Sequence, residues 1–398
     1  MNSTLIWLGF FLALGLMLII ARKNIWLAIF IAAYVLGKFS LSFKMLWVQT
    51  WLTITEPSIM LLALAVGMIP IIGGAMERAG LMDDLVSNLP LKRKPLMAFS
   101  SAFLGLLPMP GGALLSAPLI ERSGKSVAND HKTAINVWYR HVFLLIYPLG
   151  MLLATTAMAK VNLYTAILYL IPGFLFMLGL GNFFLLSKVK NNEDNKKQVQ
   201  VKKVILPITI LIIAPLIHAI LMKILPNWIQ EIPLMIGVTT SILLAIYFGK
   251  LGKKDLKEIM VKMKPWNFAL IIVAMFLFLN IFKSSQTSRV IAEAAFSKTF
   301  LLIGVGALLG FATGRVQVPI SILLPIYLAQ FGVNSMTPLV FTIMFFAVYQ
   351  GYIISPVHPC VSVSMHYFKT NLKSFYKLTA LPASISLAVV WGVAAIFL

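Results

Sequence analysis

Apolar runs of roughly 17–25 residues recur along this chain, and each is long enough to cross the hydrocarbon core of a bilayer as a helix. The composition agrees, because 60% of the 398 residues are hydrophobic and only 11% are charged, too few to cover a soluble protein of this length. We therefore predict an all-α polytopic membrane protein. Ten runs fit a single crossing: 4–21, 25–42, 57–76, 138–159, 163–186, 204–222, 232–249, 266–283, 336–367 and 378–397.

Two further apolar segments, 96–120 and 300–330, are interrupted at their centres by helix-breaking residues. Pro108 to Gly112 interrupts the first, and Thr313 to Pro319 interrupts the second. Proline removes a backbone donor and clashes with the preceding turn, so a straight helix does not run through either segment. We expect each to be a re-entrant hairpin that returns to the side from which it entered.

The distribution of basic residues supports this topology. With both segments as hairpins, one side of the membrane carries 24 Lys and Arg and the other carries 7, while Arg140 and Arg315 fall at membrane depth. The basic side is cytoplasmic by the positive-inside rule, which predicts a multi-pass protein of the cytoplasmic membrane with both termini outside. The net charge of +21 is then explained by loops beside a lipid bilayer, and we expect no nucleic acid partner. The basic segments are 21–24, 77–95, 121–137, 187–203, 250–264 and 369–377.

The same topology divides the chain into two halves. Residues 1–186 and 204–398 each hold five crossing helices and one hairpin, and a polar cytoplasmic linker, 187–203, joins them. The first hairpin enters from the cytoplasm and the second from outside, so the halves have opposite orientations. Ten transmembrane helices plus two hairpins in a 5+5 inverted-topology repeat is a recurring plan of secondary transporters.

Two sequence landmarks share one spacing between these halves. The segment 106–120 lies 208 residues before 314–328, and Pro148 lies 208 residues before Pro356. Both landmarks contain helix-breaking residues, so we expect the two hairpin tips and two broken helices to occupy equivalent positions.

These four interruptions are expected to converge near the middle of the membrane. Non-helical backbone at that depth is tolerated only against protein or a water-filled cavity. Half-helix amino ends favour an anion there, and unwound carbonyls favour a cation. The candidate substrate- or ion-binding residues are Pro108, Pro110, Gly111, Gly112 and Ser116 in the first tip, Arg140, His141 and Tyr147 in the first broken helix, Thr313, Gly314, Arg315, Gln317 and Ser321 in the second tip, and Ser355, His358 and Ser362 in the second broken helix.

Each of these motifs also has a structural interpretation. Arg315 offers a bidentate fork for a carboxylate or oxyanion, but an arginine here could also extend to the outer surface. Arg140 follows Trp138 and Tyr139, a pattern that also fits an interfacial anchor. The prolines and glycines of the first tip could serve only to kink and pack a helix.

The histidines and the single cysteine allow two further interpretations. His358 could bind substrate or carry a proton, since its charge changes near neutral pH. His358 and Cys360 stand two apart, which suits a metal, but the chain has no HExxH motif and no second cysteine, so we expect no metal and no cofactor. No carboxylate falls in the interior of a span. A coupling ion, Na⁺ or H⁺, would therefore depend on carbonyls, hydroxyls or histidines.

Three motifs resemble a known family: LLPMPGGALLSAPLIE (106–121), NVWYRH (136–141) and YQGYIISPVHPCVSVSMHYF (349–368). They are similar to DUF401, a family of uncharacterised prokaryotic integral membrane proteins placed in the ion transporter superfamily. The resemblance implies hairpins that meet at a central site, a transport domain that moves against a scaffold, and a homodimer. The dicarboxylate symporters of that superfamily have Ser-Asn-Thr at their hairpin tips, and this chain has other residues at its predicted tips. Leu144 and His366 stand where similar members of the DUF401 family have glutamate.

The resulting hypothesis is a secondary active transporter of a small, organic anion that works by alternating access and is coupled to an ion. An intramembrane enzyme acting on a lipid is the alternative from another class. It needs a nucleophile–base pair or a metal cluster, which no local motif supplies, so we expect no enzyme. An anion channel is the third possibility. ATP-driven transport is disfavoured because the chain has no GxxxxGK[ST] loop.

Overall fold

The computed structural model describes residues 3–89, 91–106, 112–124, 126–189, 200–293 and 296–398, and all regular structure in these ranges is helical. Within them, eight helical segments are long and apolar enough to cross a membrane, so the chain is a multi-pass helical membrane protein. These segments are α1 (Ser3–Ile20), α4 (Pro57–Arg78), α10 (Leu163–Gly181) continued by a π-helical turn to Leu186, α11 (Val201–Ile224), α12 (Glu231–Gly249), α14 (Pro265–Ser284), α18 (Pro338–Ile354) with α19 (Pro359–Phe368), and α20 (Leu372–Phe397).

The other helices are shorter. Two predicted spans are not among the eight: 25–42 forms the 14-residue α2 (Ile25–Lys38), and 138–159 falls on two separate helices, α8 (Asn129–Val142) and α9 (Met151–Ala159). Four short helices were not predicted from the sequence, because their 6–13 residues are too few to cross a bilayer. They are α3 (Phe43–Thr55), α5 (Leu81–Asn88), α13 (Lys253–Met263) and α15 (Thr287–Ala292).

The predicted helix breaks are present. α8 ends at Val142 and α9 begins at Met151, on either side of Pro148, and α18 ends at Ile354 before α19 begins at Pro359. Each apolar segment with a central interruption forms two helices that pack against each other. The first pair is α6 (Arg93–Gly105) with α7 (Gly112–Ser123), and the second is α16 (Gly306–Thr313) with α17 (Gln317–Phe331).

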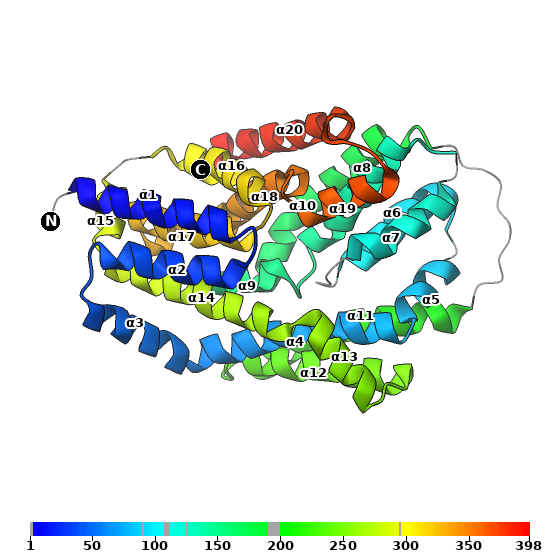
Figure 1. Ribbon diagram of the computed structural model, residues 1–398, viewed down its shortest axis with the longest axis horizontal. Helices are drawn as coiled ribbons and strands as arrows, with labels where there is room; N and C mark the ends of the chain where they lie inside the picture. The colour runs from blue at the N-terminus through cyan, green and yellow to red at the C-terminus, as the bar shows by residue number, and fades with distance from the viewer. Residues whose placement is uncertain (1–2, 90, 107–111, 125, 190–199, 294–295) are drawn as a thin grey trace.

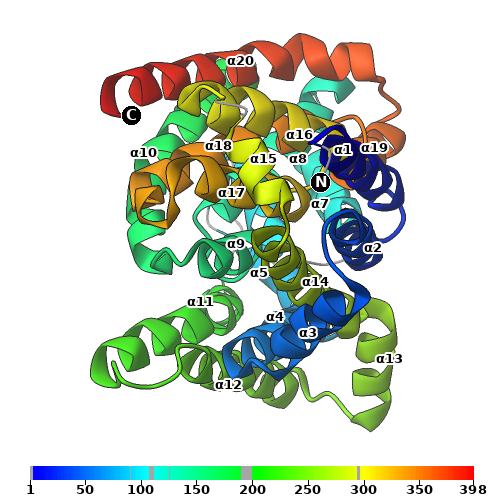
Figure 2. The ribbon, with the colours of Figure 1, turned by 90° about the vertical axis from the view of Figure 1, so that its left-hand side faces the viewer.

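Helices from the two ends of the chain pack in matching pairs. α2 packs against α14 while α12 packs against α4, α6 packs against α8 while α16 packs against α18, and α4 and α14 pack against each other. Figure 2 shows two layers, with α3, α4, α11, α12 and α13 in one and α8, α10, α16, α18 and α20 in the other. In Figure 1, α5, the beginning of α8 and the loop between α19 and α20 lie toward one end of the long axis, and the start of α1 and α15 lie toward the other.

Two glycines make equivalent close contacts in these pairs. A Cβ added to Gly105 on α6 would overlap the carbonyl oxygen of Arg140 on α8, and one added to Gly310 on α16 would overlap that of Val348 on α18. The absence of a side chain therefore lets both paired helices approach backbone to backbone. Arg140 and Val348 are 208 residues apart, the spacing shared by the two sequence landmarks.

Polar contacts fix the ends of several helices. Arg78 at the end of α4 pairs with Asp255 on α13, at 2.8 Å between Nε and Oδ1. The Gly252 N–H, which donates to the other Asp255 oxygen, and the Arg78 guanidinium hold the pKa of Asp255 below its usual range. Nearer the first hairpin, the buried Lys132 of α8 donates to Glu121 of α7 at 2.8 Å and so ties α7 to α8.

Candidate functional site

A cavity of about 580 Å³ lies where the helix breaks meet. One wall comes from α4, α14, the turn between α1 and α2 and the start of α2, and the other comes from α6, α7, α8, α9, α17, α18 and α19. Its volume is in the range of sites that hold small molecules. The wall of helix breaks supplies most of the polar side chains, so the chemistry of this cavity depends on those breaks.

Four half-helices begin at this cavity. Ala113, Met151, Gln317 and Cys360 all line it, and each lies in the first turn of its helix: α7, α9, α17 and α19. The first N–H groups of a helix have no partner within the helix and carry partial positive charge. Their convergence therefore favours an anion in the cavity.

Two arginines add full positive charges to the same wall. Arg140 and Arg315 both line the cavity, and neither forms an ion pair with a carboxylate among the described residues. Arg140 is only 5% exposed, and its buried Nη1 atom has no hydrogen-bond partner among the described residues. A buried guanidinium with an unpartnered N–H is costly, so it marks a place where a ligand could supply the missing acceptor.

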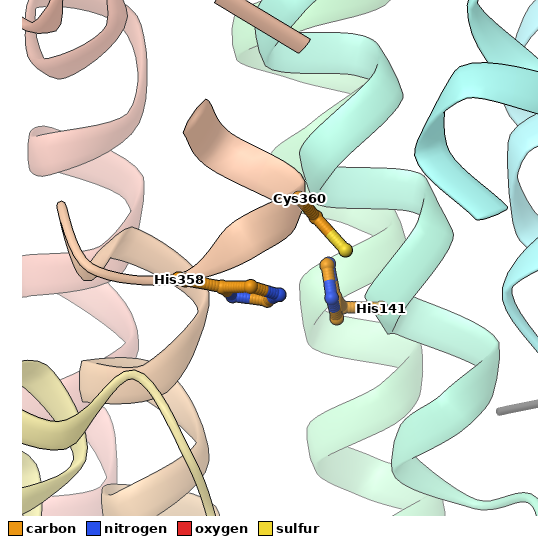
Figure 3. A group of neighbouring side chains, drawn as sticks. All are labelled: His141, His358 and Cys360. Atoms are coloured by element: carbon orange, nitrogen blue, oxygen red, sulfur yellow. The ribbon is translucent and has the colours of Figure 1, made fainter. Parts of the chain in front are cut away.

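Two histidines and the cysteine gather beside the arginines. His141, His358 and Cys360 each offer one ligand atom, and these three atoms lie within 4.8 Å of one another. Figure 3 shows the His358 ring directed toward His141, with the Cys360 sulfur next to the His141 ring. This cluster could hold a metal ion, or its thiol and imidazole could act as a nucleophile and a base.

The structure brings together five of the residues that the sequence singled out. Arg140, His141, Arg315, Gln317 and His358 line the cavity. The two arginines therefore lie at the cavity. This placement differs from an interfacial anchor for Arg140. It also differs from a side chain that extends to the outer surface for Arg315.

Several other predicted residues support the cavity without lining it. Gly314, with φ +57°, packs against the backbone of His358 at a distance that leaves no room for a Cβ. Ser355 Oγ donates to the Phe311 carbonyl at 2.5 Å, and Thr313 Oγ1 donates to the Leu309 carbonyl at 2.8 Å. The contacts of Gly314 and Ser355 hold the end of α16 against the break between α18 and α19.

The remaining predicted residues have other positions. Tyr147 is buried and donates to the Leu211 carbonyl at 3.1 Å, and Ser321 donates within its own helix to the Gln317 carbonyl at 2.8 Å. Ser362 is exposed on α19. Gly112 is the first residue of α7. Pro108, Pro110 and Gly111 lie outside the described residues.

Ser116 belongs to a buried polar network that the sequence did not predict. Asn136 on α8 accepts at Oδ1 from Ser116 on α7, at 2.6 Å, and from Ser101 on α6, at 3.0 Å. The Asn136 amide group donates to Ser364 on α19 at 3.0 Å and to the Ala113 carbonyl at 3.2 Å. The network joins the first hairpin to both broken helices. Its polar donors and acceptors are matched, so it fixes their relative positions.

Sequence reasoning missed further residues of the site. Lys23 was assigned to a cytoplasmic loop but lines the cavity, as do Asn267 and Tyr352. Cys360 also lines the cavity, and only its spacing from His358 marks it in the sequence. Trp138 was considered an interfacial residue, but it is buried and donates to the Met177 carbonyl at 3.0 Å. Only contacts between distant segments distinguish these positions.

The helices define the class of this chain as a polytopic α-helical membrane protein. It belongs to the DUF401 family, described as proteins of unknown function, whose profile matches residues 2–397. No curated protein matches the sequence. Among solved structures, the chain is similar to the YdaH transporter of Alcanivorax borkumensis, whose topology is described as unusual. The TM-score is 0.58 and the identity 14%, over 84% of this chain and 85% of that one, so this likeness is one of fold.

Proposed function

We propose that this chain is a secondary active transporter of a small anion, organic by preference, in the cytoplasmic membrane. One observation carries the proposal: Arg140 and Arg315 face one cavity without a carboxylate partner among the described residues. Four helix amino ends at the same cavity add to its positive potential. Carboxylates and oxyanions match the bidentate geometry of a guanidinium.

The arrangement of helices supports transport by alternating access. The matching pairs of helices, and the equivalent contacts of Gly105 and Gly310, are what a duplicated and inverted unit would produce. We propose residues 1–186 and 204–398 as the two units, with re-entrant hairpins at 96–120 and 300–330 and both termini outside. The cavity would then open in turn to each side as the wall of helix breaks moves against α4 and α14. A homodimer and membership of the ion transporter superfamily are parts of the same proposal.

Coupling to Na⁺ or H⁺ is proposed on the chemistry near the cavity. Main-chain carbonyls at the ends of α6, α8, α16 and α18 could hold Na⁺, and the cavity histidines could carry a proton. No carboxylate of the described residues lines the cavity, so the proposed coupling relies on carbonyls and imidazoles.

Uptake into proteoliposomes tests the proposal. The full chain would be reconstituted and given labelled mono-, di- and tricarboxylates, phosphate and sulfate under an imposed Na⁺ or H⁺ gradient. We expect saturable uptake and counterflow of at least one of these anions. Removal of either guanidinium, by Arg140→Gln or Arg315→Gln, should weaken binding by at least about 30-fold, because truncating one partner of a buried charge pair costs about 2–5 kcal/mol.

Arg289→Gln is the matched control. The Arg289 side chain is 86% exposed and pairs with Glu293, four residues further along the chain, so its loss should leave uptake unchanged. Uptake that survives both cavity substitutions would contradict the site assignment. Flux that rises linearly with concentration and shows no counterflow would instead identify an anion channel.

One observation favours a second candidate, an intramembrane enzyme that acts on a lipid. Cys360 and His141 come from different parts of the chain and meet as a thiol–imidazole pair, the kind of nucleophile–base pair that no local motif contained. In that case, Cys360→Ser would abolish conversion of a labelled lipid in liposomes that show no anion flux. Lipid conversion that persists in Cys360→Ser would exclude an essential catalytic role for this pair.

A further inference from the structure

We propose that His141, His358 and Cys360 form a binding site for a borderline or soft transition-metal ion such as Zn²⁺, with its fourth position open to the cavity. The proposal goes beyond anion transport, because these three side chains could bind the ion whether or not the chain moves an anion. It also reverses the sequence-based expectation of no metal, which counted one cysteine and no HExxH motif.

The donor set is that of a zinc site with an open position. Two imidazoles and one thiolate bind Zn²⁺ in known catalytic sites, at about 2.0–2.1 Å for nitrogen and about 2.3 Å for sulfur. Tetrahedral geometry then places the donor atoms about 3.3–3.6 Å apart. Here they lie within 4.8 Å of one another, with the two ring centroids 4.7 Å apart, so side-chain shifts of about an ångström would close the site.

Both histidines have their other ring nitrogen engaged in the way that metal ligands require. Nδ1 of His141 lies 2.5 Å from the Val137 carbonyl oxygen, and Nδ1 of His358 lies 3.1 Å from the Tyr352 carbonyl oxygen. A carbonyl oxygen can only accept, so each Nδ1 carries the hydrogen. In the neutral ring, each Nε2 is then left with the lone pair that binds a metal, and the carbonyl fixes the orientation of the ring.

The backbone holds the three ligands on two helices that both end or begin at a break, α8 and α19. His141 is one residue from the end of α8, His358 is the N-cap residue of α19, and Cys360 is the second residue of α19. Gly314 packs against the His358 backbone, and the Tyr349 hydroxyl donates to the His141 carbonyl. The site would therefore link the two broken helices.

The neighbouring arginines decide what completes the site. Arg140 and Arg315 both act electrostatically on His358, and their charges oppose a bare dication. Cysteine binds metals as the thiolate, whose negative charge offsets part of this repulsion. The open position faces the cavity, so a fourth ligand that is an anion would be attracted by the metal and by both guanidinium groups. Anions should therefore strengthen Zn²⁺ binding.

Cobalt(II) spectroscopy of the untagged full chain in detergent tests the site. Co²⁺ bound to a thiolate gives a charge-transfer band, and Cys360 is the only cysteine of the 398 residues, so the band can come from no other side chain. We expect one Co²⁺ per chain with this band, and its displacement by one equivalent of Zn²⁺. Cys360→Ser should abolish the band, and His141→Ala or His358→Ala should weaken Co²⁺ binding at least tenfold.

His366→Ala is the matched control, because His366 lies on α19 but is exposed and does not line the cavity. Its Co²⁺ spectrum should equal that of the unaltered chain. Absence of the band in the unaltered chain, or metal binding by Cys360→Ser with undiminished affinity, would overturn the proposal.

A second measurement needs no variant and so does not depend on how the variants fold. Zn²⁺ should slow alkylation of Cys360 by a small maleimide at least tenfold, whereas Mg²⁺, which prefers oxygen ligands, should not. Equal alkylation rates with and without Zn²⁺ would contradict the site. Anion uptake is a separate readout, so a failure of the metal site and a failure of the transport proposal can be told apart.

Discussion

Replacing Arg140 by methionine should make the chain more stable without an anion and less stable with one. The buried Nη1 atom of Arg140 has no partner within the described part of the chain, and a buried unsatisfied donor costs about 1–3 kcal/mol. Methionine keeps an unbranched apolar side chain of similar length and has no N–H group to leave unpaired. We expect a net gain of about 1–2 kcal/mol from the removal of this unpaired donor.

The transported anion should reverse the order. At a concentration 100 times its Kd, a ligand that binds only the folded chain stabilises it by about 2.7 kcal/mol. The unaltered chain would gain this amount, whereas Arg140→Met would gain little because its affinity for the anion is lost. The two curves of stability against anion concentration should therefore cross.

Thermal unfolding of the detergent-solubilised protein, followed by tryptophan fluorescence with and without the anion found by uptake, measures both effects. We expect shifts of a few degrees in opposite directions, and no change for Arg289→Met, which alters an exposed side chain. If Arg140→Met unfolds at a lower temperature than the unaltered chain without anion, and the anion still stabilises it fully, Arg140 is a structural residue and this reasoning is wrong.

Three further predictions concern the framework around the site. Gly105→Ala should destabilise the chain by about 1–3 kcal/mol and reduce anion binding, because the added methyl group displaces the Arg140 backbone. Gly179 has open space around it, so Gly179→Ala should change neither stability nor binding in the same unfolding and binding assays. Glu121→Gln should lower stability by about 1–3 kcal/mol by leaving the buried Lys132 without its countercharge, and adding Lys132→Met should restore much of the loss in the same unfolding assay. The Asp255 carboxylate stabilises the folded chain at pH values above the pKa that it has in the unfolded chain, and this contribution is lost as the pH falls through the lower pKa of the folded chain. Replacing Asp255 by asparagine should therefore flatten the decrease in stability below about pH 4, as measured by unfolding over a series of pH values.

The helix breaks could be predicted because their cause is local. Pro148 and Pro356 disfavour a continuous helix, and the chain stops being helical around both. The short helices α3 and α13 could not be predicted from apolar length, since neither is long enough to cross a bilayer. α8 begins at Asn129, nine residues before the predicted span, because neighbouring helices bury Lys132 and Asn136 and pair them.

The site was predicted in part, for a similar reason. A charge at membrane depth is costly wherever it lies, so Arg140 and Arg315 could be selected from their positions in the sequence alone. The partners of a side chain depend on packing between distant segments. Nothing in the local sequence indicates that Cys360 lies beside His141, or that the hydrogen bonds of Asn136 join α8 to α6, α7 and α19.

In the proposed inverted repeat the two halves share their framework of helices, but the side chains at equivalent positions differ. With the shared spacing of 208 residues, Val348 is the counterpart of Arg140, and Gly150 is the counterpart of His358. An alternating transporter built this way would show the anion different walls from its two sides, so the half-saturating concentrations measured on the two faces of one liposome should differ. The maximal rates in the two directions must then differ by the same ratio, because equal anion concentrations without a coupled gradient give no net flux. The kinetic constants can therefore differ between the two faces, while at equilibrium the anion concentrations on both sides are equal.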